Sequence, residues 1–205
     1  MNTFIQTPGR RAARKSATRS RLLAQARRLF AERGFDATTI RDVAAEAGVA
    51  VGTVFVHFPD KGSLLAGTLA EHLEQALGRA LATLPPDGAR RRIRHVLGAL
   101  FRSYARHPAL SRVLVKEMLF AEGEPRREAQ RDVDAFIARL AEWCAEPGAL
   151  RPGLDPGDAA HAVFAAYLAA LVEGLAQARP RPERMVARVE QLVAPWFAAK
   201  DGRRR

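Results

Sequence analysis

The residues from Thr39 to Leu65 read TIRDVAAEAGVAVGTVFVHFPDKGSLL, and their pattern organises the first third of the chain. Apolar residues at positions 40, 43, 44 and 47 share one face of a two-turn helix. Thr39 followed by Asp42 resembles a capping box at the start of that helix, with Asp in place of the usual Glu or Gln. Gly48 marks its end, and residues 51–58 predict a second short helix that stops before Pro59.

Two short helices joined by a tight turn that contains a glycine are the pattern of a helix-turn-helix unit. Ala44 and Ala47 are small enough for the helices to cross closely, and Gly48 tolerates a left-handed backbone. Val54 and Phe58 lie four residues apart and predict the buried face of the second helix. From periodicity alone, residues 38–58 fit equally well as two short helices of an ordinary all-α core.

The rest of the chain also predicts helices. Apolar residues at 22, 23, 26, 29 and 30 indicate a helix over residues 18–33, which Gly34 ends. Residues 1–16 are polar and basic, and we interpret them as a flexible arm. No stretch alternates convincingly as a β-strand. The later apolar periods and the breaks rich in Pro and Gly predict helices over residues 61–83, 88–106, 108–121, 124–146, 156–178 and 182–199.

The chain is strongly basic. It holds 33 Lys and Arg against 22 Asp and Glu, a net charge of +11 over 205 residues. Such a balance favours a polyanionic partner, either nucleic acid or an acidic membrane surface. Residues 1–66 carry a net +6, whereas residues 67–205 carry +5 over twice the length, which favours a nucleic-acid partner for the first part.

The residue types predict a cytoplasmic protein without disulfides or a metal site. Cys144 is the single cysteine, and the five histidines show no paired metal-binding spacing. The first residues contain no apolar segment typical of a secretory signal. The longest apolar candidate, residues 159–178, contains His161, Glu173 and Gln177, so we expect no membrane-spanning helix and no membrane partner.

The string from Thr39 to Leu65 resembles the DNA-binding signature of the TetR family of bacterial regulators. The family pattern runs Gly-Val, a small polar residue, any residue, a small residue, Thr or Ser, an aliphatic, an aromatic, any residue, His and Phe, with Lys and Leu at fixed distances beyond. The matching residues are Gly48, Val49, Ala50, Val51, Gly52, Thr53, Val54, Phe55, Val56, His57, Phe58, Lys61 and Leu64, preceded by Phe30, Gly34, Phe35, Thr38 and Thr39. The resemblance covers about residues 18–66, and for residues 67–205 it extends only to architecture.

The resemblance implies an all-α fold of about nine helices, in which a three-helix DNA-binding domain precedes an α-helical bundle for ligand binding and dimerisation. The expected parts are a flexible basic arm over residues 1–16, a helix-turn-helix domain over 17–66 with its motif at 39–58, an effector-binding and dimerisation domain over 67–200, and a basic tail over 201–205.

The resemblance also implies DNA contacts. Arg41, Val51, Gly52, Thr53 and Phe55 match positions that face the bases. Thr39, His57 and Lys61 match positions that contact phosphates. Arm residues Arg10, Arg11, Arg14 and Lys15 either lie along DNA or form a solvated tail, and the two readings have similar weight.

Two residues depart from the family pattern. Ala50 stands where Ser is common, so the recognition helix lacks its usual side-chain cap, a loss of ~1 kcal/mol. Phe55 stands where Tyr is commoner, and its ring has no hydroxyl for a phosphate but can pack on a thymine methyl. Together with Val51, Gly52 and Val56, it gives a recognition face poor in hydrogen-bonding groups.

In the second domain the resemblance implies an effector pocket and a dimer interface. Each aromatic or apolar pocket candidate is also compatible with ordinary core packing; the candidates are Phe101, Tyr104, Met118, Phe136, Trp143, Phe164 and Tyr167. Polar candidates within apolar stretches are His95, His161 and Glu173. The last two helices are expected to form the dimer interface through Leu168, Leu171, Val172, Leu175, Val189, Leu192, Val193 and Trp196.

These features predict a transcriptional regulator, a repressor released from a palindromic operator by a small-molecule effector, with no cofactor. An enzyme is disfavoured because no nucleophile with a base, and no metal cluster, stands out. A third interpretation is a basic helical protein that binds RNA or membranes nonspecifically. Salt would distinguish it, because nonspecific binding weakens uniformly as salt rises.

Overall fold

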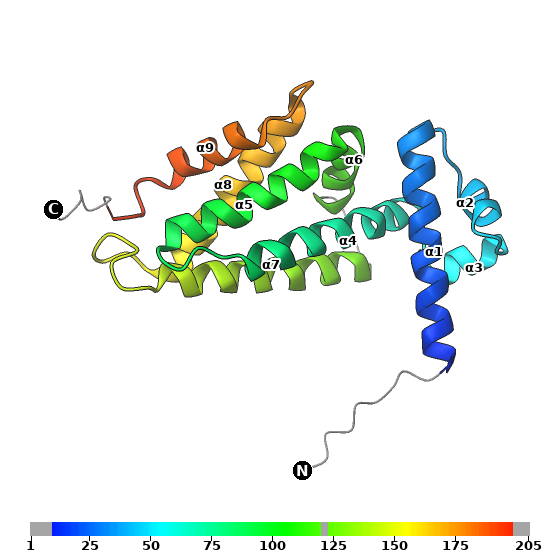
Figure 1. The fold of residues 1–205 in the computed structure, drawn as a ribbon, viewed down its shortest axis with the longest axis horizontal. Coiled ribbons are helices and arrows are strands. Elements are labelled where there is room, and N and C mark those ends of the chain that lie inside the picture. Colours follow the sequence, from blue (N-terminus) through cyan, green and yellow to red (C-terminus); the bar gives the residue numbers. More distant parts are fainter. Residues whose placement is uncertain (1–9, 120–122, 199–205) are drawn as a thin grey trace, which may run out of the picture. The chain divides into compact units, whose positions relative to one another are not determined.

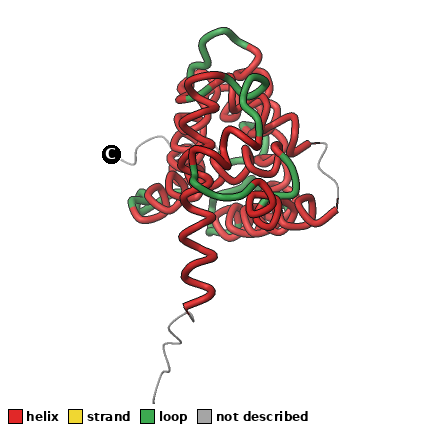
Figure 2. The backbone as a smooth tube through the Cα atoms, turned by 90° about the vertical axis from the view of Figure 1, so that its right-hand side faces the viewer, coloured by secondary structure: helices red, strands yellow, loops and turns green. Residues whose placement is uncertain are grey.

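The computed structural model describes residues 10–119 and 123–198 of the chain. Within these ranges it contains nine helices and no β-strand, as Figures 1 and 2 show, which confirms the predicted all-α fold. The helices are α1 (Arg10–Arg33), α2 (Ile40–Glu46), α3 (Val51–His57), α4 (Lys61–Ala82), α5 (Ala89–Arg106), α6 (Pro108–Leu119), α7 (Gly123–Cys144), α8 (Pro156–Ala176) and α9 (Pro182–Val193).

The chain divides into two compact units, residues 1–70 and residues 71–205. The division falls inside α4, which begins in the first unit and continues into the second. The first unit thus holds α1, α2, α3 and the start of α4, which include the predicted helix-turn-helix.

The first unit is built on α1. Its predicted apolar stripe is buried, comprising Leu22, Leu23, Ala26, Leu29 and Phe30. The helix ends as expected at Gly34, whose φ of +86° is readily adopted only by glycine and whose N–H donates to the Phe30 carbonyl at 3.1 Å. Gly67 of α4 allows a close approach to α1, because a Cβ there would lie 2.8 Å from Leu23 Cδ2.

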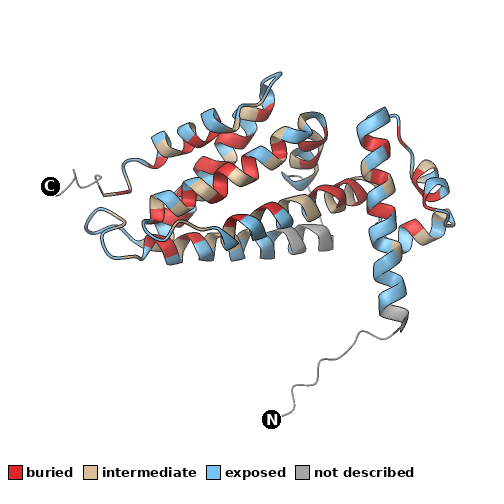
Figure 3. Cartoon of the chain, viewed as in Figure 1, coloured by how far each residue is buried: buried red, intermediate tan, exposed pale blue. Residues whose placement is uncertain are grey.

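The prediction of a flexible arm is wrong for residues 10–16, because α1 begins at Arg10. After Gly9 the sequence RRAARKSA contains no Gly or Pro, and Ala, Arg and Lys are among the best helix formers. The polar composition of residues 13–16 therefore marks an exposed part of the helix, seen in pale blue in Figure 3. Residues 1–9, like the predicted tail at 201–205, lie outside the described residues.

The second unit is a bundle in which α8 packs against both α7 and α9, and α9 also packs on α5. Much of the buried face of α8 is small, including Ala159, Ala160, Val163, Ala166 and Ala170. By length and composition α8 could cross a membrane, and 44% of its most apolar window is buried inside the protein, so length and composition alone do not mark it as a membrane span. Figure 3 shows its buried residues in red between neighbouring helices.

The last helix is shorter than the predicted 182–199, because α9 ends at Val193. Pro195 follows, and proline lacks an N–H for the helix and clashes with the carbonyl four residues earlier. Trp196 therefore lies beyond the helix, which corrects its predicted place on α9. Its neighbour Phe197 is 1% exposed and forms an antiparallel bridge with Leu150, which fixes the end of the chain to the loop between α7 and α8.

Helices α8 and α9 meet closely at Gly174, and a substitution there can test this packing. A Cβ at Gly174 would lie 2.7 Å from Met185 Cγ and Sδ, and Met185 is itself buried. We expect Gly174→Ala to lower the free energy of unfolding by about 1–3 kcal/mol, because the buried Met185 side chain must leave its position or the two helices must move apart. Urea unfolding followed by circular dichroism measures the change.

The matched control is Gly78→Ala in α4, where a Cβ would have no atom within 4 Å. Replacing a helical glycine with alanine at such a site should stabilise the protein by up to ~1 kcal/mol. Equal stability of Gly174→Ala and the unmodified chain would contradict the close approach.

Candidate DNA-binding interface

The start of α2 carries the predicted capping box. Thr39 is the N-cap, and its Oγ1 accepts a hydrogen bond from the Asp42 N–H at 3.2 Å. In return Asp42 Oδ2 accepts from the Thr39 N–H at 2.8 Å and from the Thr39 hydroxyl at 2.7 Å. These hydrogen bonds, more than the nearby Arg33, lower the pKa of Asp42. Since the Thr39 hydroxyl donates to Asp42, its predicted phosphate contact would require that bond to be exchanged.

The turn between α2 and α3 has the predicted glycine geometry. Gly48 has φ +62°, its N–H donates to Ala45, and the N–H of Val49 donates to Ala44 at 3.0 Å. Ala50 is the N-cap of α3 and makes no side-chain capping hydrogen bond, as the sequence indicated. The helix depends instead on packing by its predicted anchors.

Those anchors are Val54 and Phe58, which are 0% and 3% exposed. The opposite face of α3 is open. Phe55 is 50% exposed, Val56 is 72% exposed and Gly52 is also exposed, while Val51 and Thr53 are half-buried. Arg41 of α2 is exposed as well. Four of the five residues predicted to face the bases therefore lie on α3, and the fifth, Arg41, is exposed on α2, which packs against α3.

Basic side chains of α1 lie near the end of α3. His57 is half-buried, and its pKa is lowered first by that burial and then by the charges of Lys15 and Arg19. The Arg19 guanidinium lies 5.1 Å from the centre of the Phe58 ring. His57 is thus mainly neutral at pH 7 and can donate one N–H to a phosphate while the two cations supply charge.

The sequence analysis missed Arg19. The spacing of Lys15 and Arg19, four residues apart, could have identified it, because it places both side chains on one face of a helix. The interpretation of residues 10–16 as an arm concealed this spacing. Arg14 is exposed on the same helical extension. The side chains of Arg10 and Arg11 lie outside the described residues, so their predicted role stays a prediction.

Lys61 has a different role from the predicted phosphate contact. Its Nζ donates to the carbonyls of Phe35 at 2.9 Å, Thr38 at 3.0 Å and Asp36 at 3.5 Å. It also lies 4.3 Å from the centre of the Phe35 ring. An ammonium group has three N–H donors, and here all three face the loop between α1 and α2. The structure therefore assigns this charge to holding the loop.

Two further contacts fix that loop and α2. The buried Thr38 hydroxyl lies 2.9 Å from the Gly34 carbonyl and 3.3 Å from that of Leu29, both at the end of α1. Arg28 of α1 forms an ion pair with Glu46 of α2. These contacts hold α2, and through the turn α3, in a defined position on α1.

Comparison with known proteins agrees with this geometry. The sequence model of the family described as bacterial regulatory proteins of the tetR family matches residues 22–68, which include the capping box, the turn, α3 and the start of α4. Residues 22–68 therefore resemble this family of bacterial regulators. This confirms the resemblance noted from the Thr39 to Leu65 string.

Among curated relatives, the helix-turn-helix-type transcriptional repressor KstR of Rhodococcus jostii is 30% identical over 122 residues, which are 60% of this chain and 57% of that protein. The chain thus matches little more than half the length of this relative. Among solved structures, the regulator FadR from Bacillus subtilis in complex with stearoyl-CoA has a TM-score of 0.68 at 20% identity, covering 86% of this chain and 98% of that one. NalD from Pseudomonas aeruginosa, a repressor of a multidrug efflux pump, has a TM-score of 0.59 at 25% identity, covering 93% and 100%.

In the second unit, most predicted pocket residues form one aromatic cluster. The Tyr167 ring stacks on Phe101 at 5.3 Å and lies 6.0 Å from Phe164 and 6.1 Å from Phe136. The side chains of Tyr104 and Tyr167 interact with each other, and burial is the main cause that raises the pKa of both hydroxyls. The cluster joins α5, α7 and α8 through an apolar wall with one buried pair of hydroxyl groups.

The other pocket candidates lie elsewhere. Met118 is 41% exposed on α6, and Trp143 is buried at the end of α7. The polar candidates make contacts near the surface: His95 with Thr83, His161 with the Gly157 carbonyl, and Glu173 with Arg188. The prediction that these three residues line a buried pocket is wrong, because His161 and Glu173 are exposed and His95 is half-buried.

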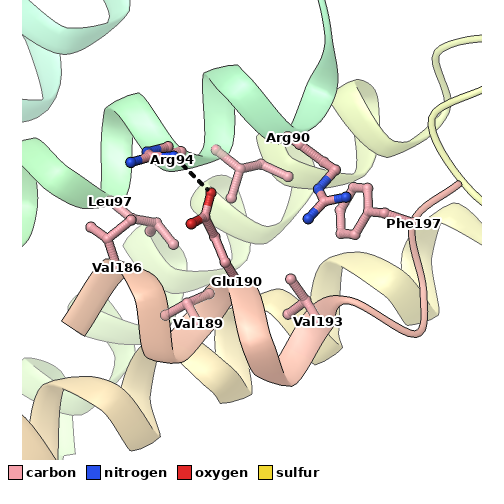
Figure 4. A pocket seen from close by; sticks show the side chains of 9 residues that line it. Arg90, Arg94, Leu97, Val186, Val189, Glu190, Val193 and Phe197 are labelled. Atoms are coloured by element: carbon pink, nitrogen blue, oxygen red, sulfur yellow. Dashed lines mark hydrogen bonds and ion pairs between the residues drawn. The ribbon is translucent and has the colours of Figure 1, made fainter. Parts of the chain in front are cut away.

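A small hollow lies between α5 and α9 (Figure 4). It is lined by Arg90, Ile93, Arg94, Leu97, Val186, Val189, Glu190, Val193 and Phe197, with an ion pair between Arg94 and Glu190 at 3.4 Å at its edge. Its volume of about 10 Å³ has room for roughly one water molecule. It contains none of the predicted pocket residues and is too small for an effector.

The predicted dimer residues separate into two groups. Leu171, Leu175, Val189 and Val193 are at most 5% exposed, so their side chains pack within their own subunit. This corrects their assignment to the interface, because a side chain inside one subunit is not available to another. Val172 and Leu192 are 47% and 38% exposed, and Leu168 and Trp196 are half-buried.

Metal-binding groups and thiol chemistry can be described for residues 10–119 and 123–198. No group of three His, Cys, Asp or Glu side chains that could hold a metal ion is present there. Burial, and then the charge of Glu146, raises the pKa of the Cys144 thiol to about 11, so it stays protonated near pH 7.

The hydrogen bonds of Lys61 predict a loss of stability on its substitution. We expect Lys61→Met to lower the free energy of unfolding by about 2 kcal/mol, because the loop carbonyls lose a charged donor. Thermal or urea unfolding measures it. Arg41→Met is the matched control, since it also removes one cation from an exposed position and should change stability by less than ~0.5 kcal/mol. If the two variants were equally stable, Lys61 would not stabilise the loop, and its predicted contact with a DNA phosphate would be favoured instead.

Proposed function

We propose that this protein is a dimeric transcriptional repressor that binds a palindromic operator and leaves it when a small molecule binds the second unit. The observation that supports it most directly is the exposed face of α3, with Lys15 and Arg19 of α1 near its end at His57 and with Arg41 exposed on the neighbouring α2. An exposed helix of this kind fits the major groove, while flanking cations fit the phosphates. The relatives named as repressors support the same function.

The proposed partner in the dimer is a second copy of the chain. Val172 on α8 and Leu192 on α9 are large exposed apolar side chains on neighbouring packed helices. Ala165, Ala169 and Ala176 are exposed on α8 as well, and small residues allow helices of two subunits to approach. A two-fold dimer would present two α3 helices to successive major grooves, and such a dimer reads a palindrome.

The proposed effector is an apolar small molecule that binds at the aromatic cluster around Tyr167. The cluster offers apolar rings and one buried hydroxyl pair, the mixture common in ligand sites. FadR of Bacillus subtilis binds stearoyl-CoA in its solved complex, and an acyl-CoA is the first compound to try. Helix α4 belongs to both units, so a shift of its end would reach Lys61 at its start. The protein would work in the cytoplasm, with α8 as a core helix.

Selection of bound DNA from a random pool tests the central proposal. We expect an enriched palindrome whose half-sites are about one helical turn apart or more. The selected sequence should stay preferred above ~150 mM salt, whereas a nonspecific binder would lose all duplexes alike. A pool without any enriched sequence would refute the proposal and favour the nonspecific alternative.

The proposed interface predicts that Val172→Glu with Leu192→Glu yields monomers, because two charges per subunit would have to be buried. Both side chains are exposed in the single chain, so the subunit should keep its helical content. Sedimentation velocity gives the oligomeric state and circular dichroism the fold. Leu154→Glu, at an exposed apolar residue in the loop before α8, is the control and should remain dimeric. A dimer that survives the double substitution would place the interface elsewhere.

A further inference from the structure

The apolar character of the α3 surface is unusual for the first unit. Phe55 and Val56 are the exposed large hydrophobic side chains among its described residues, and they are adjacent. At helical spacing Val56 lies opposite the buried anchors Val54 and Phe58, and Phe55 lies on the adjoining flank of α3. A contiguous exposed apolar surface, unlike a single exposed apolar residue, indicates a binding site.

Gly52 on the same helix is not required by the fold. Its φ is not positive, and a Cβ at this position would have no atom of the protein within 4 Å. A glycine inside a helix disfavours folding relative to alanine by a factor of about five. Since no neighbour in the protein needs the missing side chain, the space it leaves fits close approach of a partner to the helix backbone.

The surroundings of this surface indicate the chemistry of the partner. Lys15 and Arg19 act on His57 at one end of α3, and Arg41 is exposed on α2. An apolar centre with a cationic rim matches the major groove of DNA at thymines, because the C5-methyl of thymine is the apolar group on the groove floor and phosphates flank it. Guanine and cytosine edges present polar groups that Phe55 and Val56 cannot hydrogen-bond, so their desolvation would be uncompensated.

We propose that α3 selects DNA by contacting thymine methyl groups: Phe55 and Val56 pack on them, and Gly52 lets the helix approach the base edges. This rests on the proposed function as a DNA-binding regulator and assigns the chemistry of its sequence preference. Polar contacts from Arg41 and Thr53 fix the position of α3 along the DNA, while apolar packing distinguishes thymine from cytosine.

The test uses the full-length protein and the operator selected from the random pool. Thymines of each half-site are replaced one at a time by deoxyuridine, which removes only the methyl group. We expect affinity to fall by about fourfold for each contacted methyl. The dependence of affinity on salt should not change, because the phosphate contacts remain.

Variants of the protein identify the side chains that sense the methyl. Val56→Ala should bind the unmodified operator less tightly. At the base that Val56 contacts, this variant should bind the thymine and deoxyuridine forms of the operator with nearly equal affinity. Gly52→Ala should fold at least as stably as the unmodified chain and bind the operator less tightly. Leu154→Ala is the matched control for loss of an exposed apolar side chain. It should leave the ratio of affinities for the thymine and deoxyuridine operators unchanged at every base.

The outcomes separate this inference from the proposed function. If the selected palindrome is bound equally well with thymine or with deoxyuridine, the inference about thymine methyl groups is overturned, but the proposed function as a regulator still holds. The same conclusion follows if half-sites consist of G·C pairs, or if both Val56→Ala and Phe55→Ala keep the full thymine preference. Unchanged binding by Gly52→Ala overturns the close approach. A pool with no enriched sequence overturns both proposals.

Discussion

The ammonium group of Lys61 connects the first residue of α4 to the loop between α1 and α2. It donates to the carbonyls of Phe35 and Thr38, and Thr38 in turn bonds back to the end of α1. A short loop bound from both sides cannot let α2 rotate freely, so the turn and α3 are carried to one place on α1. The proximity of Lys15 and Arg19 to the end of α3 depends on that placement.

Local sequence signals predicted the helix-turn-helix because its boundaries are set locally. The Thr39 and Asp42 pair, Gly48 at φ +62° and the anchors Val54 and Phe58 each act within a few residues. Two helix boundaries were predicted wrongly. At the first, polar composition was given more weight than helix propensity, and at the second, apolar periodicity was given more weight than a proline. Residues 10–16 are polar yet helical, and Pro195 stops α9 although the apolar period continues to Trp196.

The site was predicted less completely, because its partners come from distant elements. Sequence spacing identified the face of α3 but could not show that Lys61 points to a loop rather than outward, or that Arg19 packs on Phe58. Helix α8 illustrates the same limit. It is apolar on more than one side, so periodicity alone did not separate Leu171, buried by its own bundle, from Val172, which stays exposed.

The missing cap at Ala50 has a consequence for the motion of α3. A seven-residue helix without a side-chain cap has little stability of its own and is held by Val54 and Phe58. Its backbone amides should therefore exchange with deuterium by local opening sooner than those of the middle of α1. Ordering this segment on a DNA duplex would cost conformational entropy, so specific binding should carry a more favourable enthalpy and a larger entropic penalty than a rigid recognition helix would show.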